Sequence, residues 1–295
     1  MAVVTTGFFD GVHLGHRAVI KALVSSARER GEEAIVVTFW PHPRTVLQQD
    51  AREFRILTTL DEKKALLASL GVDRVEVIPF TRAFAAMTAR EYLALLRERY
   101  GATRLVMGYD NRIGSDRLTA AELSAPDIEV VWRCSWAEEA APEDASSAVS
   151  STRIRNALLE GRVEDAEAML GYRYSLCGAV VAGNRLGRTI GFPTANMQLY
   201  EPLKLIPGNG VYAVEAEVLG SKWQGMTNIG VRPTVGGSAR TVETHLLAFD
   251  EDIYGLPLRI TFLCKLRDEI RFPSLDALKE QLAKDRTARA WIAEK

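Results

Sequence analysis

The chain has 295 residues, of which 47% are hydrophobic and 25% are charged, a composition typical of an ordinary globular protein. Its length exceeds the roughly 100–200 residues of a single domain, so we expect two domains, each able to bury its own core. Lys and Arg (37) nearly balance Asp and Glu (38), which argues against the basic surface that a nucleic-acid partner requires and leaves small anionic substrates open.

Strand and helix patterns alternate along the first half. Short apolar runs predict strands at Val3–Phe8, Ala34–Trp40, Arg74–Ile78, Arg104–Met107 and Ile128–Trp132. Helical patterns lie near residues 15–30, 59–70, 88–100 and 150–170. Helix signals accompany them: capping-box spacing at Thr59 with Glu62 and at Thr88 with Glu91, and stops at Gly31, Gly71 and Gly101. This alternation predicts an α/β domain with a mostly parallel sheet.

The periodicity changes near residues 171–174, which places a boundary between a first domain, 1–171, and a second domain, 172–295. Val211–Leu219 and Leu258–Leu266 alternate apolar with polar residues, as half-buried strands do, and they predict a small antiparallel barrel. Two closing helices are expected at Ser274–Leu282 and Thr287–Ile292. The acidic, Pro-containing segment 137–150 is expected to be a solvated loop of the first domain.

The expected compartment follows from three features. The first residues lack the charged start and long apolar core of a signal peptide, and no apolar run reaches the roughly 18 residues of a membrane-spanning helix. Cys134, Cys177 and Cys264 lie far apart and without metal-binding spacing, which favours unpaired thiols in a reducing compartment. We therefore expect a cytoplasmic protein with no membrane partner.

The segment Gly7–His16, GFFDGVHLGH, follows the first predicted strand and leads into a helix. His13 and His16 are three residues apart, so they share one face at the start of that helix. Free backbone N–H groups and the helix dipole attract phosphate there, and the two imidazoles can donate hydrogen bonds to a phosphoryl group under attack. Two structural histidines are the alternative. The context favours a phosphate-handling loop.

A second motif of the first half is SSTRIR, residues Ser150–Arg155, in which hydroxyls precede two arginines at a helix start. Hydroxyl donors and guanidinium charge together suit an anion site. Taken alone, the motif also fits an N-cap followed by a solvated basic face. Combined with the two histidines, it predicts a clamp for a triphosphate.

The second half carries a different set of polar residues. No GxxxxGK[ST] phosphate loop occurs, and the GxGxxA match at residues 208–213 precedes a strand rather than a helix. Thr194 and Asn196 are two residues apart in GFPTAN, so in an extended segment they face one side, where they can share a Mg–nucleotide complex. Glu243 stands with His245 in an apolar, strand-like segment. A carboxylate there is either paired structurally or a general base.

In the first half, GFFDGVHLGH, TFWPHP (38–43), GYDNRIG (108–114) and SSTRIR resemble the nucleotidyltransferase domain of bacterial bifunctional riboflavin kinase/FAD synthetases. The resemblance implies a Rossmann-like domain that adenylylates FMN with ATP. It implies catalytic roles for His13 and His16. It also implies ATP contacts by Gly7, Asp10, Gly11, Ser151, Thr152 and Arg155, and flavin contacts by Phe39 and Asp110. Because the FMN phosphate is already anionic, alignment and charge stabilisation suffice without a general base.

In the second half, GFPTAN (191–196), GMTNIGVRPTVGG (225–237), VETHLLAF (242–249) and DIYG (252–255) resemble the riboflavin kinase domain of the same family. The resemblance implies a riboflavin kinase-like barrel that phosphorylates riboflavin with ATP and Mg²⁺. Glu243 matches the catalytic base, which a neutral 5′-hydroxyl nucleophile needs. Thr194 and Asn196 match the Mg–ATP ligands. Gly183 is assigned to ATP, and Arg271 to the border of the flavin.

The main hypothesis is therefore an enzyme that converts riboflavin to FMN in its second half and FMN to FAD in its first, with riboflavin, FMN and ATP as partners. An alternative is a nucleotidyltransferase whose barrel only binds flavin for regulation, but the intact set of Thr194, Asn196 and Glu243 argues against it. A non-enzymatic barrel that binds RNA is disfavoured by the lack of a basic stripe with interleaved aromatic residues.

Overall fold

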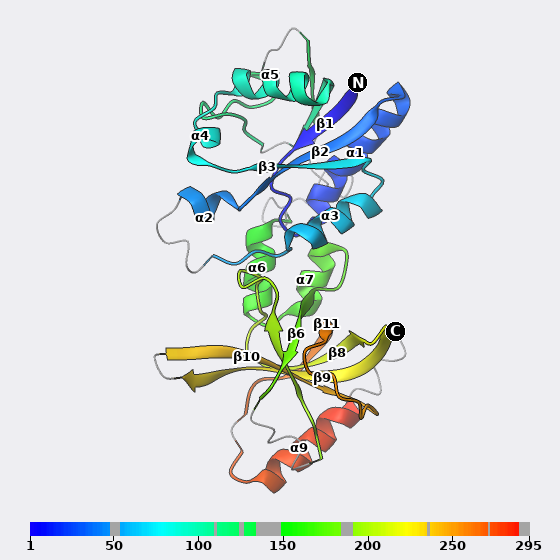
Figure 1. The fold of residues 1–295 in the computed structure, drawn as a ribbon, viewed down its shortest axis with the longest axis vertical. Coiled ribbons are helices and arrows are strands. Elements are labelled where there is room, and N and C mark those ends of the chain that lie inside the picture. The colour runs from blue at the N-terminus through cyan, green and yellow to red at the C-terminus, as the bar shows by residue number, and fades with distance from the viewer. Residues whose placement is uncertain are drawn as a thin grey trace, which may run out of the picture. The chain divides into compact units, whose positions relative to one another are not determined.

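The computed structural model describes residues 1–47, 54–108, 111–123, 127–133, 149–183, 191–234, 237–270 and 272–288. The chain divides into two compact units, Met1–Ser151 and Thr152–Lys295. Figure 1 shows the elements of both units, coloured along the sequence. Cys134 and most of the acidic segment 137–150 lie outside the described residues.

The first unit is built on a five-stranded parallel sheet. Its strands are β1 (Ala2–Thr6), β2 (Glu33–Trp40), β3 (Arg74–Pro79), β4 (Ala102–Gly108) and β5 (Glu129–Arg133). They lie in the order β3-β2-β1-β4-β5, and every neighbouring pair is parallel. The predicted α/β domain with a parallel sheet is thus confirmed. β1 ends two residues earlier than predicted, because the chain leaves the sheet at Gly7 ahead of a left-handed residue, Phe9 (φ 48°).

Helices connect these strands. They are α1 (Leu14–Arg30), α2 (Pro43–Leu47), α3 (Leu60–Ser69), α4 (Arg82–Ala85) and α5 (Ala89–Tyr100). The capping boxes predicted at Thr59 and Thr88 are both present, with reciprocal hydrogen bonds to the glutamate three residues later. α1 and α5 end at Gly31 and Gly101, which adopt the left-handed conformation and bond back to the last helical turn.

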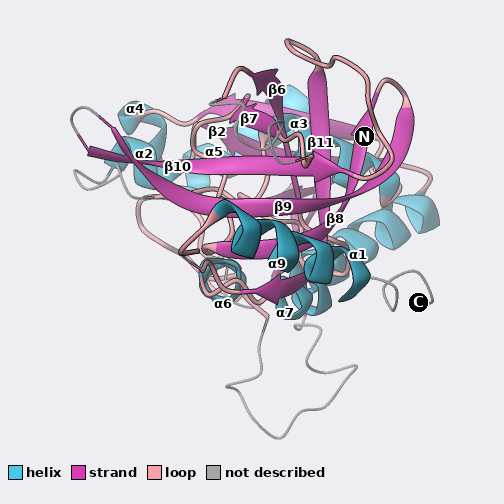
Figure 2. Ribbon diagram, turned by 90° about the horizontal axis from the view of Figure 1, so that it is seen from below, coloured by secondary structure: helices cyan, strands magenta, loops and turns pink. Residues whose placement is uncertain are grey.

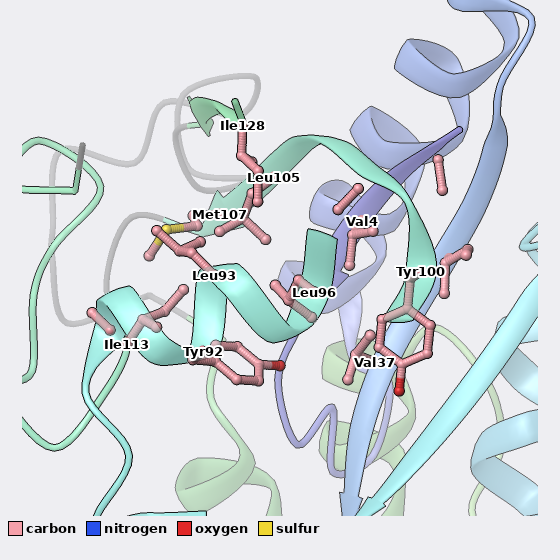
Figure 3. Close-up of a cluster of buried hydrophobic side chains, with 14 of the residues drawn as sticks. Val4, Val37, Tyr92, Leu93, Leu96, Tyr100, Leu105, Met107, Ile113 and Ile128 are labelled. Carbon is pink, nitrogen blue, oxygen red and sulfur yellow. The ribbon is translucent and has the colours of Figure 1, made fainter. Parts of the chain in front are cut away.

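Each face of the sheet carries its own core, because successive side chains of a strand point to opposite faces. Figure 3 shows the core on one face, where α5 contributes Tyr92, Leu93 and Leu96. The strand residues of this core include Val4, Val37, Leu105 and Met107. The core on the other face joins α1 and α3 to the intervening strand residues, among them Val3, Val36, Val106, Ile20, Leu23 and Leu67. The sheet is therefore covered on both faces, as parallel sheets usually are.

The strand order determines where this sheet can hold a ligand. β1 lies between β2 and β4, so the winding reverses between β1 and β4, and ligands of such sheets bind beyond the carboxyl ends of the strands at this point. The chain segments found there follow Thr6 and Gly108. Asn111 Nδ2 donates a hydrogen bond to the Thr6 carbonyl oxygen (3.3 Å) and joins the two segments.

The second unit begins with two helices that lead into a closed barrel. α6 (Ser151–Leu159), whose first residue belongs to the first unit, and α7 (Val163–Leu170) replace the single helical stretch expected over 150–170. Gly161 separates them with a left-handed backbone (φ 78°). The barrel strands, magenta in Figure 2, are β6 (Ser175–Val181), β7 (Ala195–Leu199), β8 (Gly210–Val218), β9 (Ser221–Thr234), β10 (Gly237–Leu246) and β11 (Pro257–Arg267).

The barrel closes in the order β10-β7-β6-β11-β8-β9, with every pair antiparallel. This confirms the predicted small antiparallel barrel. The alternating residues predicted to face its core are buried, both in β8 (Tyr212, Val214, Ala216 and Val218) and in β11 (Leu258, Ile260, Phe262 and Cys264). Cys177 and Cys264 form no disulfide within the described part of the chain.

One helix, α9 (Leu275–Ala288), stands where two closing helices were expected. It continues through the predicted gap after Leu282, and residues 289–295 lie outside the described residues. The buried carboxylate of Asp285 accepts two hydrogen bonds from Arg267 Nε of β11 (2.9 and 3.1 Å) and one from Gln281 Nε2 (2.8 Å). This ion pair fastens α9 to the barrel.

Replacing Asp285 by Ala is expected to lower the free energy of unfolding of the barrel by about 3 kcal/mol, because the largely shielded Arg267 guanidinium, 14% exposed, loses its buried carboxylate partner. Hydrogen exchange of barrel amides, followed by mass spectrometry, measures the change. Glu215→Ala is the matched control, since it removes an exposed pair with Lys222 and should cost less than about 1 kcal/mol. Equal effects of the two substitutions would contradict this role.

Candidate active sites

The loop between β1 and α1, residues 7–13, has a strained backbone. Phe9 (φ 48°) and Val12 (φ 38°) adopt the left-handed conformation, which is uncommon for non-glycine residues and costly for a β-branched one. Gly11 (φ 85°) adopts it without that cost. Such strain persists only where the surrounding structure holds the chain in place, and it is concentrated at functional sites.

Hydrogen bonds to Asp10 keep the loop in this conformation. Its buried carboxylate accepts hydrogen bonds from the N–H groups of Leu57 (2.9 Å) and Thr58 (3.2 Å). The Gly11 N–H donates to Thr58 Oγ1 (3.0 Å), and Ser151 Oγ donates to the Asp10 carbonyl oxygen (2.9 Å). Three predicted site residues, Asp10, Gly11 and Ser151, therefore meet in one network, although Asp10 and Ser151 are 141 positions apart. The Asp10 carboxylate thus fixes the conformation of the loop.

The two predicted histidines stack at the start of α1. His13 caps the helix, its Nδ1 accepting a hydrogen bond from the His16 N–H (3.4 Å), so a neutral His13 carries its proton on Nε2. The ring centroids of His13 and His16 are 3.6 Å apart and the rings are inclined by 18°. A Cβ on Gly15 would lie 3.3 Å from the His13 ring. The glycine of HxGH thus leaves room for the stack.

His16 is a neutral group near pH 7. Burial, followed by the charges of His13 and Lys63, holds its pKa well below the usual 6.5. Its Nδ1 has no accessible surface and no hydrogen-bond partner among the described residues, which leaves Nε2 for a ligand. The ring meets Phe9 edge-on at 5.3 Å. His16 can therefore donate a hydrogen bond to a phosphate at the helix start, where free N–H groups add further donors.

A cavity of about 310 Å³ lies at the carboxyl end of the same sheet and contains two predicted site residues, Gly7 and Phe39, in its lining. Further lining residues were not predicted: Phe8, Phe80, Phe84, Tyr92, Asn111 and Arg112. Phe80 directly follows β3, just as Phe39 lies near the end of β2, so position at the carboxyl edge was the available signal. Phe39 meets Phe84 at 5.2 Å between ring centroids. Asp110 lies outside the described residues.

The SSTRIR motif begins α6. Ser151 is its first helical residue, and Thr152 and Arg155 follow in its first and second turns. Ser151 is joined to the loop of the first unit through Asp10. Thr152 and Arg155 belong to the second compact unit, so their role toward ATP stays a prediction.

In the barrel, pairing brings three polar residues into one row. Asn196 of β7 lies opposite Glu243 of β10, and Glu243 lies opposite Asn228 of β9. Paired residues of antiparallel strands project to the same face, so the three side chains are neighbours. Thr227 and Thr244, the next residues along, are fully buried and share a hydrogen bond (2.8 Å); the polar row therefore faces the other side of the sheet. Asn228 was not predicted, because strand register is needed to find it.

Of the other predicted ATP residues of the barrel, Gly183 lies beside this row. A Cβ on Gly183 would overlap the Asn196 amide, so these two residues are in contact. Thr194 lines a cavity of about 460 Å³ together with Pro193, Thr244 and Tyr254, and the lining of this cavity includes neither Asn196 nor Glu243.

His245 holds the segment that carries Thr194. Its Nδ1 lies 2.8 Å from the Pro193 carbonyl oxygen, and since a carbonyl only accepts, Nδ1 is the donor. Burial lowers the pKa of His245 from the usual 6.5, which favours this neutral form. Residues 184–190 and Arg271 lie outside the described residues, so the predicted flavin contact of Arg271 stays a prediction.

In comparisons with known proteins, the two halves of the chain match two different family models. Residues 1–153 match the family model described as FAD synthetase, and residues 170–292 match the one described as riboflavin kinase. The bifunctional riboflavin kinase/FMN adenylyltransferase of Escherichia coli (strain K12) is 40% identical over 294 residues, 98% of this chain and 92% of that protein. Its counterpart from Bacillus subtilis (strain 168) is 34% identical over 288 residues, 97% of this chain and 90% of that protein.

A solved structure described as a macrolide-efflux protein from Streptococcus pneumoniae has a TM-score of 0.91 and 34% identity, covering 98% of this chain and 94% of that chain. No helix in the described part of the present chain is long and apolar enough to cross a membrane. The chain thus belongs to the family of bifunctional riboflavin kinases/FMN adenylyltransferases, which phosphorylate riboflavin to FMN and adenylylate FMN to FAD.

Proposed function

We propose that adenylyl transfer takes place at loop 7–13 of the first unit, with His13 and His16 donating hydrogen bonds to the phosphates of ATP. A phosphate oxygen of FMN attacks the α-phosphorus, the bond to the β-phosphate breaks, and pyrophosphate leaves with the electron pair. Ser151, which is joined to the loop through the Asp10 carbonyl oxygen, adds a hydroxyl contact to the triphosphate. The stacked, neutral His16 and the rigid loop support this role, because prearranged donors stabilise a charged transition state best.

The flavin ring of FMN is assigned to the cavity lined by Phe39. An isoalloxazine ring is flat and aromatic, and it packs well against aromatic side chains. Phe8, Phe80, Phe84 and Tyr92 surround Phe39 in that lining. Gly7 belongs both to the cavity and to the loop, which supports binding of the flavin and of the reacting phosphate in one site.

Replacing Phe39 by Leu is expected to raise KM for FMN in FAD synthesis about tenfold, because stacking on an aromatic ring contributes roughly 1–3 kcal/mol. Leucine keeps an apolar group in the core, so kcat should change little, whereas the smaller side chain should lower the free energy of unfolding by about 1 kcal/mol. Steady-state kinetics with FMN as the varied substrate measures the effect. Tyr200→Leu, which removes an exposed aromatic ring far along the chain, should leave this KM unchanged. An unaltered KM in the Phe39 variant would place the flavin elsewhere.

For the kinase reaction we assign the general base to Glu243. Its carboxylate takes the proton of the riboflavin 5′-hydroxyl as that oxygen attacks the γ-phosphorus of ATP, and ADP leaves. Asn196, directly opposite Glu243, and Thr194 hold the nucleotide. Gly183 has no side chain, which allows its backbone to lie against the Asn196 amide. The observation that carries the assignment is this pairing, because it brings a carboxylate and an amide 47 positions apart in sequence to the same place.

Mg²⁺ fits the donor set at this position. The ion prefers oxygen ligands and is usually held by one or two protein oxygens together with substrate phosphates. Asn196, opposite Glu243, supplies an amide oxygen, and Thr194, two residues earlier in the chain, supplies a hydroxyl oxygen. When bound, Mg²⁺ neutralises phosphate charge. ATP is therefore proposed to enter as its magnesium complex.

The proposed catalytic domains are residues 1–171 and 172–295. The kinase family model begins at residue 170, and the first barrel strand begins at Ser175. A cytoplasmic location is proposed as well, supported by Cys177 and Cys264, which form no disulfide within the described residues.

A direct test supplies the full chain with riboflavin, ATP and Mg²⁺ and resolves the flavins by chromatography. FMN should form first and FAD after it. Addition of EDTA should stop FMN formation, and added Mg²⁺ should restore it. FMN without FAD would contradict the assignment of the first unit, and the absence of both products would contradict the whole proposal.

A further inference from the structure

Lys63 is a buried lysine next to the phosphate loop. It belongs to α3, where it and Leu67, one turn later, are the buried residues of the helix. Its side chain is only 3% exposed. The ammonium donates a hydrogen bond to Thr38 Oγ1 (3.4 Å), and Thr38 Oγ1 in turn donates to the Phe8 carbonyl oxygen (3.4 Å). One side chain, Thr38, therefore separates the Lys63 ammonium from the loop that contains Phe8.

The surroundings of Lys63 compensate little of its charge. An ammonium has three donors, and in the described part of the chain Thr38 is its hydrogen-bond partner, with no carboxylate at ion-pair distance. Asp10 attracts it from farther away. Burial lowers the pKa of Lys63 to about 8, so it remains mostly protonated at neutral pH. Retaining a buried charge of this kind disfavours the folded state.

The fold has no evident need for this charge. The start of α3 is already capped by Thr59 and Glu62, and the Asp10 carboxylate is already bonded by the N–H groups of Leu57 and Thr58. An apolar residue of similar length would fill the same space. What would compensate the charge is an anion at the loop, and the charge of Lys63 reaches that place, because it contributes to the lowered pKa of His16.

We propose that Lys63 is a positioning residue for adenylyl transfer, a buried cation beneath the phosphate loop that draws the polyphosphate of ATP to His16 and stabilises the departing pyrophosphate. The inference rests on the proposed role of loop 7–13 and His16. As the bond between the α- and β-phosphates breaks, negative charge grows on the leaving group, and a fixed cation in a low-dielectric setting stabilises that charge. The same cation disfavours protonation of His16, which keeps that ring neutral.

The test uses Lys63→Met in the full chain. Methionine keeps the length and the apolar stem and removes the charge. We expect kcat/KM for ATP in FAD synthesis to fall about 10²-fold or more, while riboflavin phosphorylation is unchanged. The thermal midpoint should stay the same or rise at pH 7, because a buried charge is removed. Lys64→Met is the matched control, since the neighbouring lysine of α3 is exposed; it should change neither activity.

Charge rescue and pH dependence distinguish this role from packing. Lys63→Arg should recover part of the lost kcat/KM. In the wild type, kcat/KM for ATP should decline as the pH rises through about 8, where the free enzyme loses the Lys63 proton; the other titratable groups nearby are Asp10, His13 and His16. Lys63→Arg should not show this decline, because a guanidinium keeps its charge.

Three results would overturn the proposal. Normal FAD synthesis by Lys63→Met is the first. The second is a loss of FAD synthesis that comes with a lower thermal midpoint and no rescue by arginine, which would indicate packing. The third is normal FAD synthesis by His16→Asn, measured in parallel, which would remove the proposed site itself. If His16→Asn is inactive and Lys63→Met is active, only the role of Lys63 is removed.

Discussion

Replacing Glu243 by Gln should reduce riboflavin phosphorylation by about 10²–10⁴-fold, the usual contribution of a positioned general base. The amide has nearly the same shape as the carboxylate, so the pairing of β10 with β7 and β9 should be retained. The loss should appear mainly in kcat, because the proton moves only as the 5′-hydroxyl attacks. Synthesis of FAD from supplied FMN should be unaffected, since the sheet of the first unit carries that reaction.

The control for this variant is Glu217→Gln, which changes an exposed glutamate of β8 in the same barrel. It should phosphorylate riboflavin at the wild-type rate. The measurement is initial FMN formation with saturating riboflavin and ATP. If Glu243→Gln kept more than about a tenth of the wild-type kcat, another group would have to accept the proton.

Replacing His16 by Asn should have the opposite selectivity. FAD synthesis from FMN should fall by about 10²–10³-fold, the range found when one prearranged donor to a charged transition state is lost. Asparagine keeps a donor but is too short to reach the position of Nε2, and it cannot stack on His13 at 3.6 Å. Riboflavin phosphorylation should continue at the wild-type rate, which verifies that the barrel has folded, and circular dichroism of the variant should match that of the wild type.

Lys21→Ala provides the control in the same helix, because Lys21 is an exposed residue of α1. FAD synthesis should be normal in this variant. If His16→Asn retained full FAD synthesis, the phosphates of ATP would have to be held elsewhere in the first unit. If it lost both activities, the two sites would not be independent.

Much of the fold could be predicted because its determinants are local. The capping boxes at Thr59 and Thr88 consist of residues three positions apart. The strand alternation in β8 and β11 reports directly which face is buried. Features that depend on contacts between residues far apart in the sequence could not be predicted. α9 continues through the gap that was expected after Leu282, and its Asp285 is held by Arg267 of β11, a contact that no local pattern reveals.

The same distinction between local and tertiary determinants applies to the candidate sites. His13 and His16 are close in sequence, so their shared face followed from helix geometry, and their stacking agrees with it. The link between Asp10 and Ser151 and the neighbouring position of Asn228 both depend on tertiary structure. Lys63 escaped notice because a lysine in a helix is usually exposed; only the packing of α3 shows that this one is buried.

The most direct test of two independent sites in one chain is complementation between the variants, starting from riboflavin, ATP and Mg²⁺. Alone, Glu243→Gln should form neither FMN nor FAD, and His16→Asn should accumulate FMN without FAD. Mixed in one tube, they should form FAD, because FMN made by the barrel of one chain is adenylylated by the first unit of the other. A mixture that accumulates FMN and forms no FAD, although Glu243→Gln still converts supplied FMN, would contradict this account.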